Sequence, residues 1–409
     1  MSLRTDCDKI VQEAIARVRP DAAVGRALEG KTFGGKLILV AAGKAAWSMA
    51  NAAYEALGAA IDGGIVITKH GHARGAIGPL TVREAGHPVP DGDTFSATAR
   101  ALELTCGLTR ADTVLLLLSG GGSALFESPL VPREELQDVT RQLLACGADI
   151  VEMNTIRKRL SAVKGGRFAL HCAPARVFTV VLSDIIGDPL DMIASGPACP
   201  DASTAAQARA IVEKYGLKLS GRALALLEEE TPKALDNVET HVTGSVRALC
   251  AAAADVCGSL GYAPVVLTDC LTCEAREAGA FLAAIARSHQ DTDRSLAFLA
   301  GGETVVHLTG RGMGGRSQEL ALAAAEGISG LKGTAVFSVG SDGTDGPTDA
   351  AGGYVDGETR AALAARGVDL FDVLRRNDAY HALKQSGGLI MTGATGTNVN
   401  DVAVVLIRR

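Results

Sequence analysis

The chain has 409 residues, which is too long for one ordinary hydrophobic core and predicts at least two domains. Its hydrophobic content of 47% and charged content of 21% are typical of a soluble globular protein. The net charge of -6 argues against a polyanionic partner, and the aromatic content of 4% argues against a stacking platform for single-stranded nucleic acid.

The N-terminal segment MSLRTDCDKIVQEAIARV has acidic residues where a signal peptide needs an apolar core. No apolar run reaches the roughly 18 residues that a membrane helix needs, so we expect a cytoplasmic protein with no membrane partner. Nine scattered cysteines are typical of reduced thiols. Cys270 and Cys273 form the one C-x-x-C pair, and no second pair supplies the four ligands of a closed zinc site.

The first half of the chain alternates strand-like and helix-like segments, which predicts βαβ units and a mostly parallel sheet. In chain order these segments are LILVAAG, AAWSMANAAYEAL, GIVITKHG, TVLLLLSGG, REELQDVTRQLLACG, RVFTVVLSD and STAAQARAIVEKYG. A polar stretch at residues 230–245 interrupts the pattern, and we place a domain boundary within it. Residues 1–238 are therefore expected to form the first α/β domain.

The alternation resumes with VRALCAAAADVCGSLG, APVVLTD and a long helix. The next segment, SLAFLAGGETVVHLTG, contains two closely spaced apolar runs that predict an antiparallel strand pair. Residues 239–409 are therefore expected to form a second, smaller α/β domain with a mixed sheet. Because no low-complexity linker separates the domains, we expect them to pack around a cleft.

A bare glycine turn follows the leucine-rich run in the segment LLLLSGGGSALFESP, residues 115–129. The apolar run predicts a buried strand, and a helix is expected to begin after the turn. Gly120, Gly121 and Gly122 have no side chains, so a ligand can approach the backbone closely. A strand, a glycine turn and a helix together direct free N–H groups toward one point, which suits an anion. The alternative is a tight connection that needs positive φ angles.

Two other glycine motifs match nucleotide-binding patterns. GRALEGKT, residues 25–32, satisfies the P-loop pattern, but a predicted helix precedes it and a strand follows it, the reverse of what a P-loop needs. GRGMGG, residues 310–315, follows the predicted strand VVHLT and precedes a helix, which suits a dinucleotide fingerprint. The acidic residue expected about 20 positions later is missing, so a loop for another phosphate ligand fits better.

Charged residues collect where predicted strands end. Lys44 in AAGKAAWSMA lies at a helix N-terminus, where a cation is unfavourable unless an anion is nearby; the alternative is a solvated surface lysine. Asp184, Asp188 and Asp191 in LSDIIGDPLDMIASGP follow another strand, where a carboxylate can accept a proton from a substrate hydroxyl or hold Mg²⁺. Asp191 could equally cap a helix.

A second acidic loop, SVGSDGTDGPTDAAGG, carries Asp342, Asp345 and Asp349 among glycines. Oxygen ligands in a flexible loop suit a hard cation, whereas Asp-Gly turns would explain the same residues without a metal.

The segment NTIRKRLSAVKGGR, residues 154–167, is rich in basic residues. Such a helix is usually a solvated face, although one or two of its cations could line a phosphate site. His70, His72 and His87 are isolated from one another in the sequence, and we assign them no chemistry. Glycine turns, cations and clustered aspartates match phosphoryl transfer, which needs positioning, Mg²⁺ and positive charge more than covalent help.

Long motifs in one order over almost the whole chain resemble the glycerate 2-kinases of the MOFRL type. The motifs are GKAAWSMA, KHGH, EAGHPVPDG, LLSGGGSALFE, EMNTIRKRLSAVKGGRFA, SDIIGDPLDMIASGPACPDAST, GGETVVHLTGRGMGGRSQELAL, GSDGTDGPTDAAGGYVD and TGATGTNVND. Two positions depart from the family pattern as we expect it: Ser317 replaces an asparagine and Ala394 replaces a proline.

The resemblance implies two α/β domains, the first Rossmann-like with three layers, and a site in the cleft between them. It implies a kinase that transfers the γ-phosphoryl of ATP to the 2-hydroxyl of D-glycerate and gives 2-phospho-D-glycerate, with ATP and Mg²⁺ as cofactors. The chain could also form a homodimer.

The motifs carry roles to particular residues. Lys44 and Arg316 would be the cations of the active site, and Asp184 is our candidate base for the 2-hydroxyl. The expected phosphate or substrate ligands are Ser119, Gly120, Gly121, Gly122, Ser123, Asp188, Gly314 and Gly315. The expected metal ligands are Asp342, Asp345 and Asp349.

Two alternatives stay open. Members of the family are often labelled hydroxypyruvate reductases, so an NAD(P)H-dependent reductase that uses the GRGMGG loop is one. The other is a module that senses a sugar acid or a phosphate and catalyses nothing.

Overall fold

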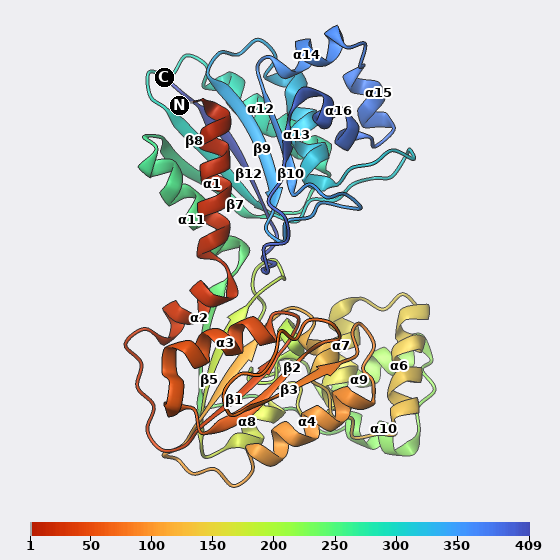
Figure 1. The fold of residues 1–409 in the computed structure, drawn as a ribbon. Helices are drawn as coiled ribbons and strands as arrows, with labels where there is room; N and C mark the ends of the chain where they lie inside the picture. The colour runs from red at the N-terminus through yellow and green to blue at the C-terminus, as the bar shows by residue number, and fades with distance from the viewer. Residues whose placement is uncertain (1) are drawn as a thin grey trace. The chain divides into compact units, whose positions relative to one another are not determined.

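The computed structural model describes residues 2–409, which form two compact units (Figure 1). The N-terminal unit contains Val24–Leu182 and Asp188–Thr243. The C-terminal unit contains Gly244–Arg409, the short segment Ser183–Gly187 and the first 23 residues of the chain. The units therefore differ from the contiguous ranges 1–238 and 239–409 chiefly in the place of the N-terminal helix.

A six-stranded sheet forms the centre of the N-terminal unit. Its strands are β1 (Leu37–Ala42), β2 (Gly63–Lys69), β3 (Leu80–Ala85), β4 (Thr113–Leu118), β5 (Arg176–Leu182) and β6 (Val238–Gly244). Their order is β3-β2-β1-β4-β5-β6, and every pair from β3 to β5 is parallel. The residues of β1 and β4 are all buried, because helices cover both faces of a parallel sheet.

Helices pack on both faces of this sheet (Figure 1). One face carries α3 (Ala46–Leu57), which contacts β1, β2 and β4. The other face packs against α4 (Gly92–Leu104) and α8 (Arg167–Cys172) in one hydrophobic cluster. The unit also contains α2 (Pro20–Leu28 in part), the 3₁₀ turns η1 (Gly58–Ala60) and η2 (Ile193–Ser195), and the single turn α5 (Gly122–Leu125).

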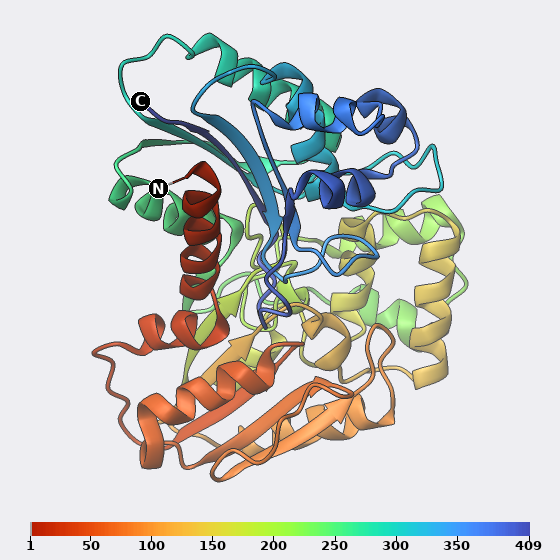
Figure 2. The ribbon, with the colours of Figure 1, turned by 45° about the horizontal axis from the view of Figure 1, so that its top comes forward.

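Four more helices of the N-terminal unit form a separate small core beside the sheet (Figure 2). They are α6 (Arg133–Ala145), α7 (Ile150–Arg159), α9 (Ala205–Tyr215) and α10 (Gly221–Leu227). Their apolar residues pack against one another, so this group buries its own hydrophobic stripe.

A second six-stranded sheet forms the centre of the C-terminal unit. Its strands are β7 (Ala263–Leu271), β8 (Leu296–Gly302), β9 (Thr334–Gly340), β10 (Gly352–Asp356), β11 (Leu389–Ile390) and β12 (Asp401–Ile407). The order is β11-β10-β9-β12-β8-β7, with β7 and β8 parallel and the other pairs antiparallel. The predicted mixed sheet is confirmed.

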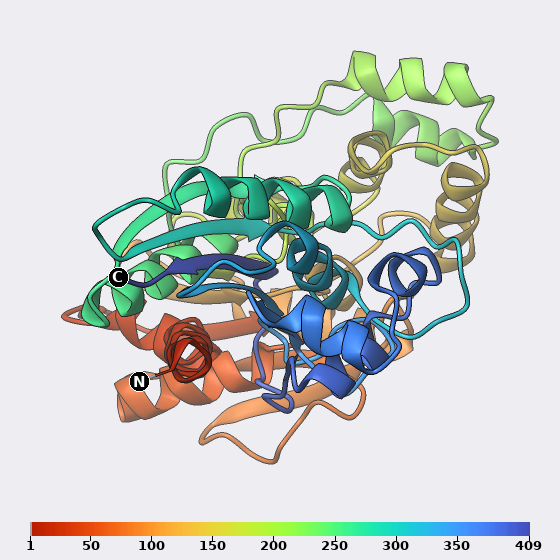
Figure 3. The ribbon, with the colours of Figure 1, turned by 90° about the horizontal axis from the view of Figure 1, so that it is seen from above.

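Helices cover both faces of this sheet as well. One face packs against α1 (Leu3–Arg17) and α11 (Val246–Ser259). The opposite face carries α12 (Ala275–Ser288), α13 (Arg316–Gly327), α14 (Thr359–Ala365), α15 (Leu370–Arg375) and α16 (Ala379–Ser386). Figure 3 looks along α1 and shows α14 to α16 away from it.

Several elements differ from the sequence prediction, and among them β3 (Leu80–Ala85) was not predicted. The predicted strand VVHLT is wrong, because residues 305–309 form no strand and β8 pairs instead with β7 and β12. Val305 makes only an isolated bridge to Glu274. The polar stretch at residues 230–245 contains β6, which the sequence did not suggest because this edge strand is only half-buried.

No helix within residues 2–409 combines the length and the apolar character needed to cross a bilayer.

Candidate functional site

The strand order of the N-terminal unit creates a switch point between β1 and β4. From β1 the chain proceeds to β2 and β3 on one side, then returns to β4 on the other. In open α/β sheets of this order, ligands bind beyond the carboxyl ends of the two strands at such a point. Here those ends carry Lys44, two residues after β1, and the glycine turn Ser119–Ser123, directly after β4.

Backbone contacts hold these two predicted motifs together. The Lys44 N–H donates to the Gly120 carbonyl at 2.8 Å, and the Ala45 N–H donates to Ser119 Oγ at 3.1 Å. Ser119 is buried, and its hydroxyl supports the loop by accepting this hydrogen bond. Gly121 has a φ of 85°, which a residue with a Cβ rarely adopts. The glycine turn therefore has both properties that the sequence left open: a positive φ angle and a main chain that no side chain covers.

The turn and its surroundings suit an anion. Within residues 2–409, the N–H groups of Gly120 and Gly121 donate to no other group. Lys44 is exposed, and no carboxylate in the same range pairs with its ammonium. The helix that follows the turn, α5, has only four residues, so the anion-binding capacity comes from loop amides and a cation more than from a helix dipole.

His87 adds to this site, although its sequence context gave no signal. A Cβ built at Gly121 would lie 3.0 Å from the His87 ring and 3.3 Å from Lys44 Cγ, so the three residues are neighbours. Burial lowers the pKa of His87, and the positive charges of Lys44 and Lys69 lower it further. The imidazole is therefore neutral at pH 7 and lies in an electropositive environment.

A hydroxyl chain fixes the last residue of the turn. Ser195 donates to Asn154 Oδ1 at 3.1 Å, and Ser195 Oγ lies 3.0 Å from Ser123 Oγ. Because a hydroxyl has one proton, Ser123 is the donor in this second contact. Ser195 and Ala194 have φ angles of 59° and 51°, and Ala194 packs against Gly122. Strained backbone of this kind persists only where its surroundings enforce it.

A buried lysine and a half-buried arginine hold the carbonyl end of the turn. Lys164 Nζ donates to the Ser123 carbonyl at 2.8 Å and to the Phe126 carbonyl at 3.0 Å, and it lies 3.3 Å from Glu127. Burial lowers the pKa of Lys164 to about 8, although Glu127 opposes the shift. Arg157 also donates to the Ser123 carbonyl, at 3.3 Å.

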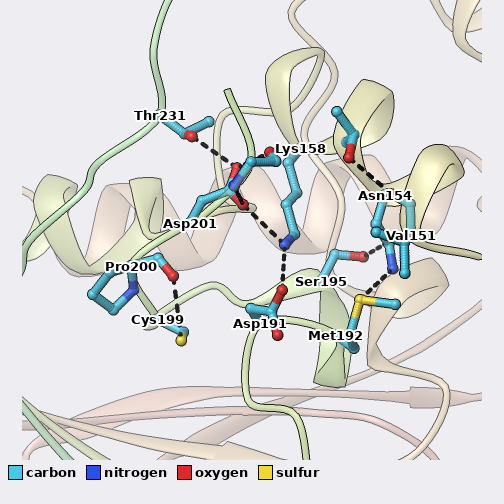
Figure 4. Close-up of polar contacts among 12 residues, drawn as sticks. Val151, Asn154, Lys158, Asp191, Met192, Ser195, Cys199, Pro200, Asp201 and Thr231 are labelled. Carbon is cyan, nitrogen blue, oxygen red and sulfur yellow. Dashed lines mark hydrogen bonds and ion pairs between the residues drawn. The ribbon is translucent and has the colours of Figure 1, made fainter. Parts of the chain in front are cut away.

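Lys158 anchors the acidic loop that follows β5 (Figure 4). Its ammonium is buried and donates to Asp191 and Asp201 at 3.1 Å each. Asp201 also accepts from Thr231 and Ser203. Asp191 is therefore an ion-pair partner and not a helix cap. The expected solvated face of the 154–167 segment is wrong for Lys158, Arg159 and Lys164, which are buried among carboxylates and carbonyls.

The two remaining acids of that loop lie in different units. Asp184 belongs to the short Ser183–Gly187 segment of the C-terminal unit and is half-buried. Asp188 belongs to the N-terminal unit and has a φ of 51°. Its Oδ1 atom is buried and has no hydrogen-bond partner within residues 2–409, which is unusual for a carboxylate oxygen.

Arg316 begins α13 in the C-terminal unit and is held by two acids that are not among the predicted site residues. Its Nε and Nη2 atoms contact the two oxygens of Asp401 at 2.5 and 3.1 Å, and Nη1 contacts Glu303 at 2.7 Å. Burial raises the pKa of Asp401, although the Arg316 hydrogen bond opposes the shift. The paired acids fix the guanidinium in place and leave it partly exposed.

Asp345 supports the same helix end. It accepts from the Ser317 and Gln318 N–H groups at 3.2 and 2.8 Å, and burial raises its pKa to about 6. Gly315 permits this approach, because a Cβ there would lie 2.3 Å from Asp345 Cγ. The unexpected Ser317 is buried and accepts a hydrogen bond from Ser338.

The three predicted metal ligands have separate partners. Asp345 fits a helix-capping role better than a metal ligand, because both of its oxygens already accept N–H groups. Asp342 accepts from the Thr344 N–H, and Asp349 accepts from the Tyr380 hydroxyl. Across the described chain, residues 2–409, the one group of three potential ligand side chains within 4.8 Å is His70, Asp91 and Asp93. There Asp91 caps α4 and hydrogen-bonds His70.

The GRGMGG loop contacts the segment between α15 and α16. The Gly312 N–H donates to the Arg376 carbonyl, and the Met313 N–H donates to Asp378. A Cβ at Gly310 or Gly312 would overlap this segment. The glycines are therefore required for packing within the unit, and the strand that a dinucleotide fingerprint needs before them is absent from this described region.

Taken together, these features define an α/β enzyme class with Rossmann strand order, a glycine turn with free amides at the switch point, and a C-terminal mixed-sheet unit. A family model described as "Domain of unknown function (DUF4147)" matches residues 6–228, and one described as the MOFRL family matches residues 296–401. The chain belongs to the family that combines these two domains, the glycerate 2-kinases of the MOFRL type.

Individual relatives agree with this assignment. The chain is 52% identical to a D-glycerate 2-kinase from Thermotoga maritima, over 99% of both chains. A crystal structure of a glycerate kinase from Thermotoga maritima superimposes with a TM-score of 0.95 at 51% identity and covers 99% of both chains. A protein from Agrobacterium vitis named as a hydroxypyruvate reductase is 39% identical over 100% of this chain and 95% of its own length.

Proposed function

We propose that this protein is a glycerate 2-kinase that transfers the γ-phosphoryl of ATP to the 2-hydroxyl of D-glycerate and gives 2-phospho-D-glycerate. The observation that carries the proposal is the full-length 52% identity to a D-glycerate 2-kinase, together with an anion-binding turn at the place where such a sheet binds ligands. Phosphoryl transfer depends mainly on positioning and on neutralising charge, which amides and cations supply.

Lys44 and the amides of Gly120 and Gly121 are proposed to bind phosphate oxygens in the N-terminal unit. The support is that Lys44 has no carboxylate partner and that both amides are free within residues 2–409. Arg316 is proposed to supply the second cation, and its bidentate contact with Asp401 would keep the guanidinium rigid. Charge placed where it develops in the transition state costs no reorganisation during the reaction.

In the proposed reaction the 2-hydroxyl oxygen of glycerate attacks the γ-phosphorus, ADP leaves, and the hydroxyl proton passes to a carboxylate. Asp184 remains the candidate base. Asp188 is proposed to bind substrate, because its buried Oδ1 atom lacks a partner among residues 2–409. A substrate hydroxyl or a cation carried with the nucleotide would satisfy that oxygen.

Mg²⁺ is proposed to enter as MgATP. The three acids of residues 342–349 do not form one carboxylate cluster in this structure, so we assign no step to a metal held there. Asp342 and Asp349 remain candidate contacts for the nucleotide-bound cation.

The proposed function is tested by incubating the purified protein with D-glycerate and MgATP and following the products by phosphorus NMR. We expect ADP and 2-phosphoglycerate to form together. Formation of 3-phosphoglycerate would contradict the assigned position of transfer, and no phosphorylated product would contradict the kinase itself. NADH oxidation with hydroxypyruvate, followed by absorbance, tests the name carried by the Agrobacterium vitis relative.

The assigned cations are tested by Lys44→Ala and Arg316→Ala. Each is expected to lower kcat by about a hundredfold or more, because removing one group that stabilises transition-state charge typically costs about 10²–10³. Lys218→Ala and Arg360→Ala are the matched controls, since Lys218 is an exposed lysine of the N-terminal unit and Arg360 an ion-paired arginine of the C-terminal unit. Near-normal kcat in both Lys44→Ala and Arg316→Ala would rule out these roles.

A further inference from the structure

A pocket of about 310 Å³ lies in the N-terminal unit, next to the glycine turn. The loop Pro88–Pro90 and Phe95 form one wall, and α6 forms the other through Leu136, Gln137, Thr140, Arg141 and Leu144; Arg157 of α7 completes the lining. Its volume is at the lower end of the range for small-molecule sites, about 300–1,000 Å³.

Two residues connect this pocket to the glycine turn. Pro88 follows His87, whose ring is a neighbour of Gly121. Arg157 lines the pocket and also donates to the Ser123 carbonyl at 3.3 Å. Its Nε atom is buried and has no partner within residues 2–409. A molecule with an apolar part in the pocket and anionic groups at the turn would contact both.

The residues that line the pocket indicate which of the two substrates, ATP or glycerate, it suits better. Val89 and Leu144 are exposed at 60% and 62%, and Phe95 is half-buried, so the walls offer apolar surface to a ligand. Glycerate is small and carries a polar group on every carbon, so it gains little from such walls. A purine has two flat apolar faces and a polar edge.

The side chain of Gln137 can form hydrogen bonds with the polar edge of a purine. This side chain is exposed, and its amide has no hydrogen-bond partner in the described part of the chain, residues 2–409. A glutamine amide has one acceptor and one donor side, the pattern that pairs with N6 and N7 of adenine. From these observations, and resting on the proposed function, we infer that this pocket binds the adenine ring of ATP, while the triphosphate extends past Arg157 to the glycine turn.

The test measures what the adenine base contributes to binding separately from what the phosphates contribute. Titration calorimetry without glycerate measures the binding of MgATP and of magnesium tripolyphosphate to the full-length protein. Leu144→Trp fills the pocket from α6, and we expect it to weaken MgATP binding by about tenfold or more while tripolyphosphate binding changes less than about twofold. Leu170→Trp on α8 is the control, because Leu170 is 56% exposed and lies outside the pocket.

Unchanged MgATP binding in Leu144→Trp would overturn the inference, and so would an equal loss of both ligands. Val89→Trp closes the pocket from the opposite wall and decides the question if Leu144→Trp does not fold, as judged by thermal melting. Because these titrations contain no acceptor, they stay informative if no phosphoglycerate forms. A kinase that binds its adenine elsewhere would form 2-phosphoglycerate in the NMR assay, but Leu144→Trp would not weaken its MgATP binding.

Discussion

Individual cations in this protein have opposite roles that their sequence positions do not reveal. Lys158 and Lys164 are buried and bind carboxylates and carbonyls, whereas Lys44 is exposed and has no carboxylate partner within residues 2–409. A buried cation without a partner would be very costly, so the first two are structural by necessity. Lys44 can neutralise a ligand because nothing in the described chain already neutralises it.

The titration of His87 can report on the proposed anion site. Burial and the nearby lysines lower its pKa below the usual 6.5, so the folded protein binds fewer protons than the unfolded chain just below pH 6.5. The free energy of unfolding therefore decreases as the pH falls below 6.5, because proton binding then favours the unfolded chain. We expect NMR titration of the His87 ring to give a pKa below 6.5, and a higher value when tripolyphosphate is bound, because the anion offsets Lys44.

The Lys44→Ala variant should also raise the pKa of His87, because it removes one of the charges that lower it. Lys218→Ala should leave it unchanged. The same pKa in the free and the tripolyphosphate-bound protein would place the anion away from His87 and Gly121.

At the scale of elements, the glycine turn can be tested with a matched pair of substitutions. Gly121 and Gly107 have φ angles of 85° and 70°, so alanine at either should cost about 1–2 kcal/mol of stability. Only at Gly121 would the new Cβ meet the His87 ring, at 3.0 Å, whereas nothing lies within 4 Å at Gly107. We expect similar losses in Tm and a large loss of kcat/KM only for Gly121→Ala. Equal activity in the two variants would show that the turn only connects β4 to α5.

Sequence patterns predicted many of the buried elements and failed where packing overrides local preference. The strands β1, β2, β4 and β5 were identifiable because buried strands are continuous apolar runs, whereas β3 was missed because it is only partly buried. The segment VVHLT looks like a strand, yet β7 and β12 already occupy both sides of β8. The edge strand β6 was missed because half of its residues are polar.

Sequence patterns likewise predicted some residues of the candidate site and missed others. Lys44 and the SGGGS turn were predictable because each follows a buried strand, and the structure brings them together. His87, Asp401 and Glu303 were not, since each contacts the site only through the fold and has no local motif.

At the scale of the whole molecule, α1 is the element whose position departs most from chain order. Its buried residues Ile10, Val11 and Ala14 pack in the same core as α11 and β12. Ile10→Ala should destabilise the C-terminal unit by about 2–4 kcal/mol, because the side chain is fully buried. Hydrogen exchange should rise in peptides from α11 and stay unchanged in β1 and β4. Lys9→Ala, an exposed neighbour, is the control, and equal increases in both units would contradict the placement of α1.

This placement of α1 also orders events during synthesis. The helix is synthesised before the N-terminal unit, whereas its contacting elements α11 (Val246–Ser259) and β9 (Thr334–Gly340) are synthesised after that unit. The N-terminal unit can close around β1 and β4 while the apolar stripe of α1 is still uncovered. A nascent chain stalled before α11 would therefore present that stripe to chaperones, and the synthesis of α11 and β9 would cover it.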